Sequence, residues 1–366
     1  MKWVRMMLFM GAVGAAVGAA GPNVLLVLAP SEGNPRNSEG DFVVLKDGRI
    51  LFVYTHFTGG GADHAAAHLA SRRSADGGMT WSAKDERVPA VRGTMNTMSV
   101  SLVRMKSGEI ALFCLVKESW EDCRMYVQVS GDEGVTWGEA RLCMAEAGYY
   151  VVNNDRVIQL ASGRLVIPAA WHRAVEGKRF NSRATAVCFL SDDEGKTWRR
   201  GRGVVEPPEK GNSGLQEPGV VELKDGRLLM LSRTDLGSQY RCYSEDGGET
   251  WSAAEATEIE SPLSPASVER IPSTGDLLMV WNDHADVPAE LKGKRTPLCA
   301  AVSRDEGKTW STPKTIEPDP EGWYCYTAIE FVGDRVLLWY CVGKGRAEGL
   351  NTTHVTSVPV GWVYGE

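Results

Sequence analysis

Two segments of the chain place an acid or a phenol where a polar loop meets an apolar strand. Glu217 begins one strand in Gly-Leu-Gln-Glu-Pro, and Arg233 follows the hairpin that this strand opens. Tyr326 begins another in Trp-Tyr-Cys-Tyr-Thr. A carboxylate that takes a proton from a phenol makes it an oxygen nucleophile, and an arginine fork binds a carboxylate through two hydrogen bonds. These residue types suit nucleophilic chemistry; a loop ion pair and a core tyrosine are the structural alternatives.

The elements that must position these residues begin with a repeated pattern, Ser-x-Asp-x-Gly-x-Thr-Trp, called a box below. Asp accepts hydrogen bonds from backbone amides, Gly takes positive φ without steric cost, and Trp offers a large surface for packing. Each box therefore predicts a locked hairpin without a catalytic role. The period of roughly 53 to 61 residues is that of a four-stranded sheet with its loops. The five boxes span residues 74–81, 130–137, 191–198, 244–251 and 303–310.

A second repeat raises the count of units to six. Each copy reads as an apolar strand, a polar turn that usually contains Gly, and a second apolar strand. Six hairpins with five boxes predict an all-β, six-bladed β-propeller. The apolar segment 23–29 is expected to supply the last strand of the sixth blade and so to close the ring. The six hairpins span residues 42–54, 101–116, 157–169, 220–232, 268–281 and 329–341.

The first twenty residues have the layout of a cleavable secretory signal. Lys2 and Arg5 precede an apolar run over 6–17, and small residues end it at Ala20. The run is short for a membrane span, although a retained anchor is the alternative. We expect a signal peptide at 1–20, a single propeller catalytic domain at 21–366, no membrane span after cleavage, and a secreted or periplasmic protein.

Charge and cysteine content exclude several other classes of function. The net charge is −7, and no basic cluster is long enough to follow a phosphate backbone, so nucleic acid is not expected as a partner. Zinc-ligand spacings are absent, and neither a metal nor a cofactor is expected. The eight cysteines allow disulfides in an exported chain, and the pairs Cys325/Cys341 and Cys114/Cys123 are expected to face each other across hairpins. Buried free thiols are favoured, because directly opposed strand pairs strain a bridge.

Boxes of this kind on six blades, behind a signal sequence, resemble the exo-sialidases (neuraminidases) and their bacterial glycosidase relatives over nearly the whole mature chain. Boxes and blades alone do not specify an activity, because many propellers share them. The resemblance implies an exo-glycosidase that hydrolyses terminal sialic acid, or a related acidic sugar, from glycans with retention of configuration. A glycan or glycoconjugate is then the expected partner.

The resemblance assigns roles to four residues. Glu217 is similar to the sialidase glutamate that activates the nucleophile, and Arg233 to an arginine that grips the substrate carboxylate. Arg295, in Lys-Arg-Thr-Pro, occupies a place similar to that of a second such arginine. Tyr326 resembles the nucleophile, and a neutral phenol avoids the repulsion that a carboxylate would meet at a carboxylate-bearing anomeric carbon.

The general acid and the third arginine are less clearly matched. Asp63, in the glycine-rich loop 58–64, resembles the sialidase acid, and His64 is its rival. Sialidases usually begin blade one with aromatic-Arg-Ile-Pro, whereas this chain has Asn-Pro-Arg-Asn-Ser-Glu-Gly-Asp over 34–41. Arg36 is near that position but a few residues early, and Glu39 puts an acid where the family has a base. Another acidic sugar, or a neutral one, therefore remains open as the ligand.

Three more polar residues begin inner strands and are predicted to contact substrate: Asn96, Asn154 and Asp155. Such side chains suit sugar hydroxyls and are equally suited to capping strand ends. Two other functions stay open besides the sialidase. One is a propeller hydrolase or lyase that acts on another acidic sugar, and the other is a carbohydrate-binding propeller without catalysis.

Overall fold

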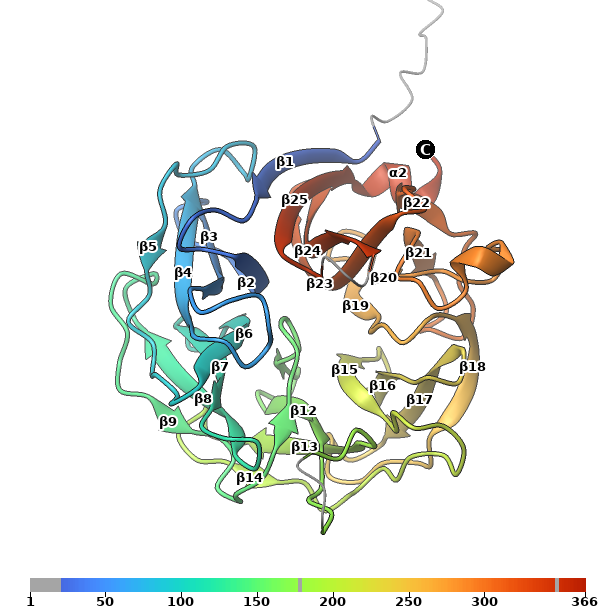
Figure 1. The fold of residues 1–366 in the computed structure, drawn as a ribbon, viewed down its shortest axis with the longest axis horizontal. Helices are drawn as coiled ribbons and strands as arrows, with labels where there is room; N and C mark the ends of the chain where they lie inside the picture. The colour runs from blue at the N-terminus through green and yellow to red at the C-terminus, as the bar shows by residue number, and fades with distance from the viewer. Residues whose placement is uncertain (1–20, 177–179, 346–348) are drawn as a thin grey trace, which may run out of the picture.

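A ring of sheets surrounds a central axis in the computed structural model, which describes residues 21–176, 180–345 and 349–366 (Figure 1). The described part forms six antiparallel sheets, each one blade of a β-propeller, as the repeats predict. The predicted signal peptide, residues 1–20, lies outside the described residues. No helix in the described part is long and apolar enough to cross a membrane.

The strands follow one another outward from the axis within each blade. The first three blades comprise β2 (Arg36–Val44), β3 (Ile50–Phe57), β4 (Ala67–Ser74) and β5 (Glu86–Arg87); β6 (Asn96–Arg104), β7 (Ile110–Lys117), β8 (Cys123–Ser130) and β9 (Arg141–Leu142); and β10 (Tyr150–Val151), β11 (Ile158–Gln159), β12 (Leu165–Trp171), β13 (Thr185–Ser191) and β14 (Arg199–Arg200).

The last three blades comprise β15 (Gln216–Glu222), β16 (Leu228–Arg233), β17 (Ser238–Ser244) and β18 (Glu255–Glu260); β19 (Ser267–Arg270), β20 (Leu277–Trp281), β21 (Leu298–Ser303) and β22 (Lys314–Glu317); and β23 (Gly322–Val332), β24 (Arg335–Lys344), β25 (Thr352–Pro359) and β1 (Asn23–Leu28). Two short helical segments complete the described elements: η1 (Ala289–Leu291) and α2 (Val360–Tyr364).

The N-terminal strand closes the ring, as the sequence predicts. β1 pairs antiparallel with β25 and forms the outer edge of the sixth blade, with Val24 opposite Thr356 and Leu28 opposite Thr353. The two ends of the chain therefore meet in one sheet (Figure 1). The sixth blade lacks a box, and it is completed instead by the backbone hydrogen bonds between β1 and β25.

Each box forms the locked turn expected from its residues. In the second box, Asp132 Oδ1 accepts from the Thr136 amide at 2.8 Å, and its Oδ2 accepts from the Thr136 hydroxyl at 2.6 Å. Ser130 Oγ accepts from the Gly134 amide at 2.8 Å. The same contacts recur in the other boxes, and all five box tryptophans pack against the hydrophobic clusters between blades.

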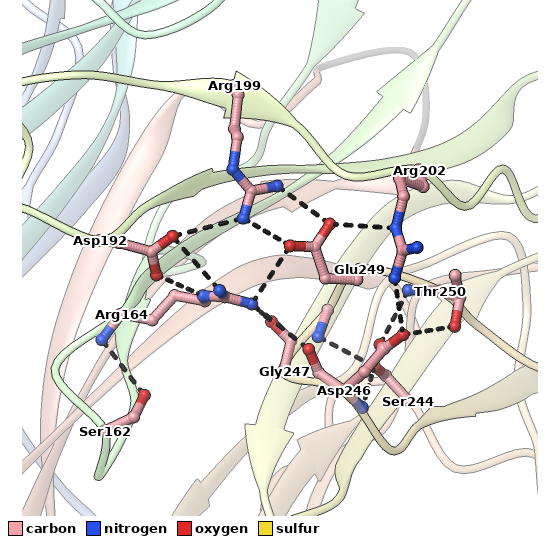
Figure 2. A network of polar contacts seen from close by, with 11 residues as sticks. Ser162, Arg164, Asp192, Arg199, Arg202, Ser244, Asp246, Gly247, Glu249 and Thr250 are labelled. Atoms are coloured by element: carbon pink, nitrogen blue, oxygen red, sulfur yellow. Dashed lines mark hydrogen bonds and ion pairs between the residues drawn. The ribbon is translucent and has the colours of Figure 1, made fainter.

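Ion pairs also join neighbouring blades at the surface (Figure 2). Arg164, in the turn before β12, binds Asp192 at 2.6 Å and donates to the Gly247 carbonyl at 3.1 Å in the next blade's box. Arg199 on β14 binds both Asp192 and Glu249. The network links the third blade to the fourth by polar contacts outside the apolar core.

Bulges on the inner strands turn selected side chains toward the axis. The pairing register shifts in β2, β6, β15 and β23, and five non-glycine residues on the innermost segments have positive φ. This left-handed conformation costs about 1–2 kcal/mol for a residue with a Cβ. Strained backbone conformations are common at functional sites, so these five positions indicate a functional site near the axis. The five residues are Glu39, Ser99, Asp155, Glu217 and Tyr326.

The cysteines are free, as the sequence favours. All eight lie within the described residues as buried thiols. Cys325 and Cys341 are paired across β23 and β24, as expected. The expectation for Cys114 and Cys123 is wrong, because Cys114 faces Tyr126 and Cys123 faces Lys117 in the actual register. The turn between β7 and β8 is longer than the symmetric hairpin that this expectation required.

Candidate active site

A cavity of about 620 Å³ lies among the inner strands and their loops. The bulged residues Glu39, Ser99, Glu217 and Tyr326 line it together with side chains from loops of several blades. Seven of the ten residues predicted for the site meet here: Tyr326, Glu217, Asp63, Arg233, Arg295, Arg36 and His64.

Glu217 and Arg233 form a close ion pair on the fourth blade. Glu217 Oε2 lies 3.0 Å from Arg233 Nη1, and both side chains are about nine-tenths buried. Gln216 Oε1 accepts from Arg233 Nε and Nη2 at 3.1 and 2.7 Å. Gln216 and Glu217 together fix the orientation of the guanidinium in the cavity wall.

Tyr326 and Arg295 lie together between the fifth and sixth blades. The Arg295 guanidinium carbon is 5.4 Å from the Tyr326 ring centroid, and Nη2 donates to the Leu263 carbonyl at 3.0 Å. Nη1 contacts Cys325 Sγ at 2.9 Å. Burial, with the charge of Glu217, raises the pKa of the Tyr326 phenol well above its usual value. The phenol is therefore neutral at physiological pH, and Tyr326 needs a base to become a nucleophile.

Arg36 is held by two carboxyl groups on the first blade. It is 4% exposed, and its Nη1 donates to Asp63 Oδ1 at 2.5 Å and to the Gly61 carbonyl at 3.1 Å. Glu39 Oε1 lies 3.6 Å from Nη2. Thus a third arginine does line the cavity, although the Arg-Ile-Pro pattern is absent from this position.

Asp63 and Glu39 differ in charge although both contact Arg36. The Asp63 side chain is 69% exposed, so partial desolvation raises its pKa only in part, and the charges of Arg36, Lys117 and Arg233 outweigh it and lower the pKa. Burial raises the pKa of Glu39 to about 7, despite the opposing charge of Arg36 and a short hydrogen bond from Ser99 Oγ. Asp63 is therefore ionised in the free protein, and Glu39 titrates near neutrality.

The other three predicted residues do not line the cavity. Asn96 Nδ2 donates to the carbonyls of Asp63 at 2.9 Å and Ala65 at 3.0 Å, and so braces the loop that carries Asp63. Asn154 is fully buried, and its Nδ2 donates to the carbonyls of Gly40 at 2.8 Å and Tyr326 at 3.1 Å.

Asp155 points away from the cavity as well. Its Oδ2 accepts from the Ile329 amide at 2.9 Å, and it belongs to a buried group of carboxyls with Asp41, Glu269 and Glu330. The polar residues Asn96, Asn154 and Asp155 thus bind backbone between blades rather than facing the cavity, which is the strand-capping alternative.

Sequence reasoning missed Gln216, Lys117 and most of an aromatic wall in the cavity lining, of which the end of the third blade's hairpin at His172 suggested one part. Gln216 could have been found from its position, because it directly precedes the predicted site residue Glu217. Lys117 ends an apolar strand and had no motif to mark it. The wall consists of Trp120, Tyr149, His172 and Phe180. Within the described residues, no group of three or more His, Cys, Asp or Glu side chains is arranged to hold a metal ion.

Comparisons with known proteins identify the family and the fold of the chain. The family model described as "BNR repeat-like domain" matches residues 57–338. A sialidase from Micromonospora viridifaciens is 26% identical over 332 residues, which are 81% of this chain and 49% of that protein. The chain therefore spans about half the length of that relative.

Solved structures show the same fold at low identity. A protein of unknown function from Dyadobacter fermentans superposes with a TM-score of 0.73 at 18% identity and covers 93% of this chain and 99% of its own. A leech intramolecular trans-sialidase, solved with 2,7-anhydro-Neu5Ac, has a TM-score of 0.71 at 14% identity and covers 95% of this chain and 71% of its own.

Proposed function

We propose, from the premise that this chain belongs to the family of BNR repeat-like domains and has the sialidase-like six-bladed propeller, that it is a retaining exo-glycosidase. Its substrate would be a glycan that ends in sialic acid or a related acidic sugar. One observation carries the proposal: a single cavity holds Tyr326, Glu217 and three arginines. A binding protein without catalysis would have no need of a strained tyrosine beside an acid.

In the proposed reaction the Tyr326 oxygen attacks the anomeric carbon while the glycosidic bond breaks. Burial raises the pKa of the phenol, so Glu217 must remove its proton during the attack. The product of this step is a glycosyl-tyrosine adduct, an aryl glycoside in which the sugar is linked through the phenolic oxygen. Water then attacks the same carbon and gives its proton to the general acid that the first step left ionised, while the phenol regains its proton from Glu217, so the configuration is retained.

The arginines bind the sugar carboxylate in this proposal. Gln216 holds Arg233 from one side, and the Leu263 carbonyl holds Arg295, so both guanidinium groups are oriented before the ligand arrives. Preorganised charge costs little reorganisation during the reaction. Arg36 is the third candidate, but it must first exchange its bond to Asp63 for one to the ligand.

This exchange supplies a way for Asp63 to become the general acid. In the free protein Arg36 keeps Asp63 ionised, which opposes proton donation. When a substrate carboxylate takes over Arg36, Asp63 loses the ion pair that lowers its pKa, and the pKa rises. Asp63 would then take up a proton and give it to the leaving oxygen. His64, on the same loop, is the alternative acid.

The test of the proposal is to trap the adduct on Tyr326. Wild type treated with a 3-fluorosialosyl fluoride, or with the matching uronic-acid probe, should carry the label on Tyr326 by peptide mass spectrometry. Tyr326→Phe removes one oxygen and should lose labelling together with at least about 10³-fold in kcat. Tyr324→Phe, on the same strand but packed in the core between the last two blades, is the matched control.

Sugar release from sialylated and uronic-acid glycans identifies the substrate, and analysis of the products separates hydrolysis from intramolecular transfer. If Tyr326→Phe kept near-normal turnover on the preferred glycan, the Tyr326/Glu217 mechanism would be wrong. An acid–base scheme that uses Asp63, His64 and Glu217 would replace it.

Export is a separate proposal and rests on the N-terminal sequence alone. Lys2, Arg5, the apolar run over 6–17 and the small residues before Gly21 support cleavage near Ala20. Intact mass of the secreted or periplasmic protein would then begin at about residue 21. A mature protein that retained Met1 would contradict the proposal.

A further inference from the structure

Lys117 is a buried cation that the proposed mechanism does not use. It ends β7, is 4% exposed and lines the cavity beside the three arginines. Its ammonium makes one long hydrogen bond, to the Asp63 carbonyl at 3.4 Å. The nitrogen also lies 5.3 Å from the Trp120 ring centroid and 5.2 Å from that of Tyr149.

The other cations of the cavity are better compensated than Lys117. Arg36 binds Asp63, Arg233 binds Glu217 and Gln216, and Arg295 donates to a carbonyl and a sulfur. For Lys117, in contrast, no carboxylate of the described chain lies within ion-pair distance. An ammonium has three donors, and its single bond here is at the limit of hydrogen-bond length.

A buried ammonium without an ion-pair partner raises the free energy of the folded protein, unless a bound ligand supplies the missing acceptors. Burial of an unpaired charge costs more than cation–π contacts return. The Lys117 side chain lines the cavity, where an acceptor of a ligand can reach it. The strand itself does not require this residue, since the rest of β7 is apolar and buried.

We propose that Lys117 forms a second anion-binding position in this cavity, and that the preferred ligand is a sugar acid with a second anionic group, such as a sulfate ester. The inference rests on the proposed function for the place of the sugar carboxylate at the arginines. The Lys117 ammonium would then bind the second anion through charge-assisted hydrogen bonds.

The charge of the cavity agrees with a dianionic ligand. Arg36, Lys117, Arg233 and Arg295 face three carboxyl groups, those of Glu39, Asp63 and Glu217. One positive charge is thus left over, and a second is left over when Glu39 is protonated, which its pKa of about 7 allows in mildly acidic solution. Burial lowers the pKa of His172 to about 4, so this ring adds no charge.

The aromatic wall gives the second position its shape. Tyr149 and Phe180 have ring centroids 5.2 Å apart, Trp120 and Phe180 6.3 Å, and His172 and Phe180 4.7 Å. These rings exclude water around the Lys117 ammonium and offer an apolar surface to one face of a sugar ring. Exclusion of water strengthens the attraction between the ammonium and an anion.

Binding of matched ligands to Lys117 variants tests the inference. Isothermal titration would compare free sialic acid with its esters sulfated at each single hydroxyl. Wild type should bind at least one ester about tenfold more tightly than the parent sugar. Lys117→Met should bring this ratio to about one, with a larger loss of affinity for the ester than for the parent sugar, while Lys117→Arg should keep most of the preference. Lys224→Met, in an exposed hairpin turn, is the control.

The outcomes separate this inference from the proposed function. An ester preference that is the same in wild type and Lys117→Met, or no preference for any ester, overturns the inference. Wild type that binds none of these sugars overturns the inference and the sialic-acid form of the proposed function, and release of a uronic acid from glycans would keep the glycosidase. Wild type that binds the ester through Lys117 but releases no sugar from any glycan supports the second anion position and overturns only the glycosidase.

Discussion

The carboxyl groups of the boxes and those near the propeller axis are the same chemical group in opposite surroundings. Hydrogen bonds from the Thr136 side chain and backbone lower the pKa of the exposed Asp132 to about 2. Burial instead raises the pKa of Glu39 to about 7 and that of Glu330 to about 8. Asp132 is held ionised by donors, whereas Glu39 and Glu330 keep a proton to higher pH because desolvation disfavours their charged form.

The partners of the two sets differ in distance along the chain. Asp132 bonds to residues two and four positions away. At the axis, the Asp155 carboxylate accepts from the Ile329 amide, which is 174 positions away. A box is therefore a local device for stability, whereas the centre depends on the assembly of all blades. Changes at the two places should affect different properties.

The largest expected effect is loss of activity at the centre. Arg233→Met should lower kcat/KM by about 10²–10³-fold on the preferred acidic glycan, because it removes a charge-assisted clamp on the carboxylate. The melting temperature should also fall, because Glu217 loses its ion-pair partner, so the activity is measured on the folded fraction. Arg227→Met, in the exposed turn of the same hairpin and paired only with Asp225, should keep both properties. Equal activity in the two variants would refute the central role of Arg233.

The next effect is loss of stability at a box. Trp198 packs edge-on against Phe113 at 5.9 Å between ring centroids and donates to the Gly195 carbonyl at 3.2 Å. Trp198→Ala should cost about 2–3 kcal/mol of unfolding free energy in urea, less than a fully buried aromatic because the ring is half-buried. The folded fraction should keep its kcat. A variant that unfolds like wild type but is inactive would show that the box is functional.

The stability of the protein should fall as pH rises, because carboxyl groups near the axis must ionise. Glu330 lies with Asp41, Asp155 and Glu269, and burial, with the charge of Asp155, raises its pKa from 4.5 to about 8. The folded state thus binds a proton more tightly than the unfolded one. This contribution is fully present below pH 4.5 and is lost as pH rises toward 8.

Thermal melts between pH 5 and 8 check this expectation. Wild type should lose stability across this range, and Glu330→Gln should lose less, by an amount of order 1 kcal/mol. Asp132→Asn serves as the contrast, because the box carboxylate stabilises above its unfolded pKa and loses this effect only as pH falls toward 2. Parallel melting profiles for wild type and Glu330→Gln would contradict the raised pKa.

The smallest effect is expected in the surface ion-pair network (Figure 2). Arg199 binds Asp192 and Glu249, but its side chain is 47% exposed. Arg199→Ala should therefore cost no more than about 0.5–1 kcal/mol, and less at high salt. Urea unfolding at low and high ionic strength measures this. A loss comparable to that of Trp198→Ala would show that blades are held together by charge as much as by packing.

The repeats were readable from sequence because each one is local. A box needs only eight residues, and its hairpin needs only a polar turn between two apolar strands, so five boxes and six hairpins predicted the propeller and its closure by 23–29. The family resemblance then marked Glu217, Arg233, Arg295 and Tyr326 by their places at inner-strand starts and hairpin ends. The structure does bring these four side chains to one cavity.

Tertiary structure alone decided which polar residues face the cavity. Asn96, Asn154 and Asp155 occupy inner-strand starts as the others do, yet hydrogen bonds to the backbone of distant segments turn them away. A bulge of one residue reverses the direction of a side chain, and sequence spacing does not locate it.

The charge state of the cavity also emerged only when the blades were assembled. Arg36 meets Asp63 across 27 positions, and Lys117 approaches the Asp63 carbonyl across 54. Residue types determined that arginines, carboxyls and a phenol were available for chemistry. Distances and burial decide which cation is paired with a carboxylate and which is left for a ligand. Both arise only when segments far apart in the sequence come together at the cavity.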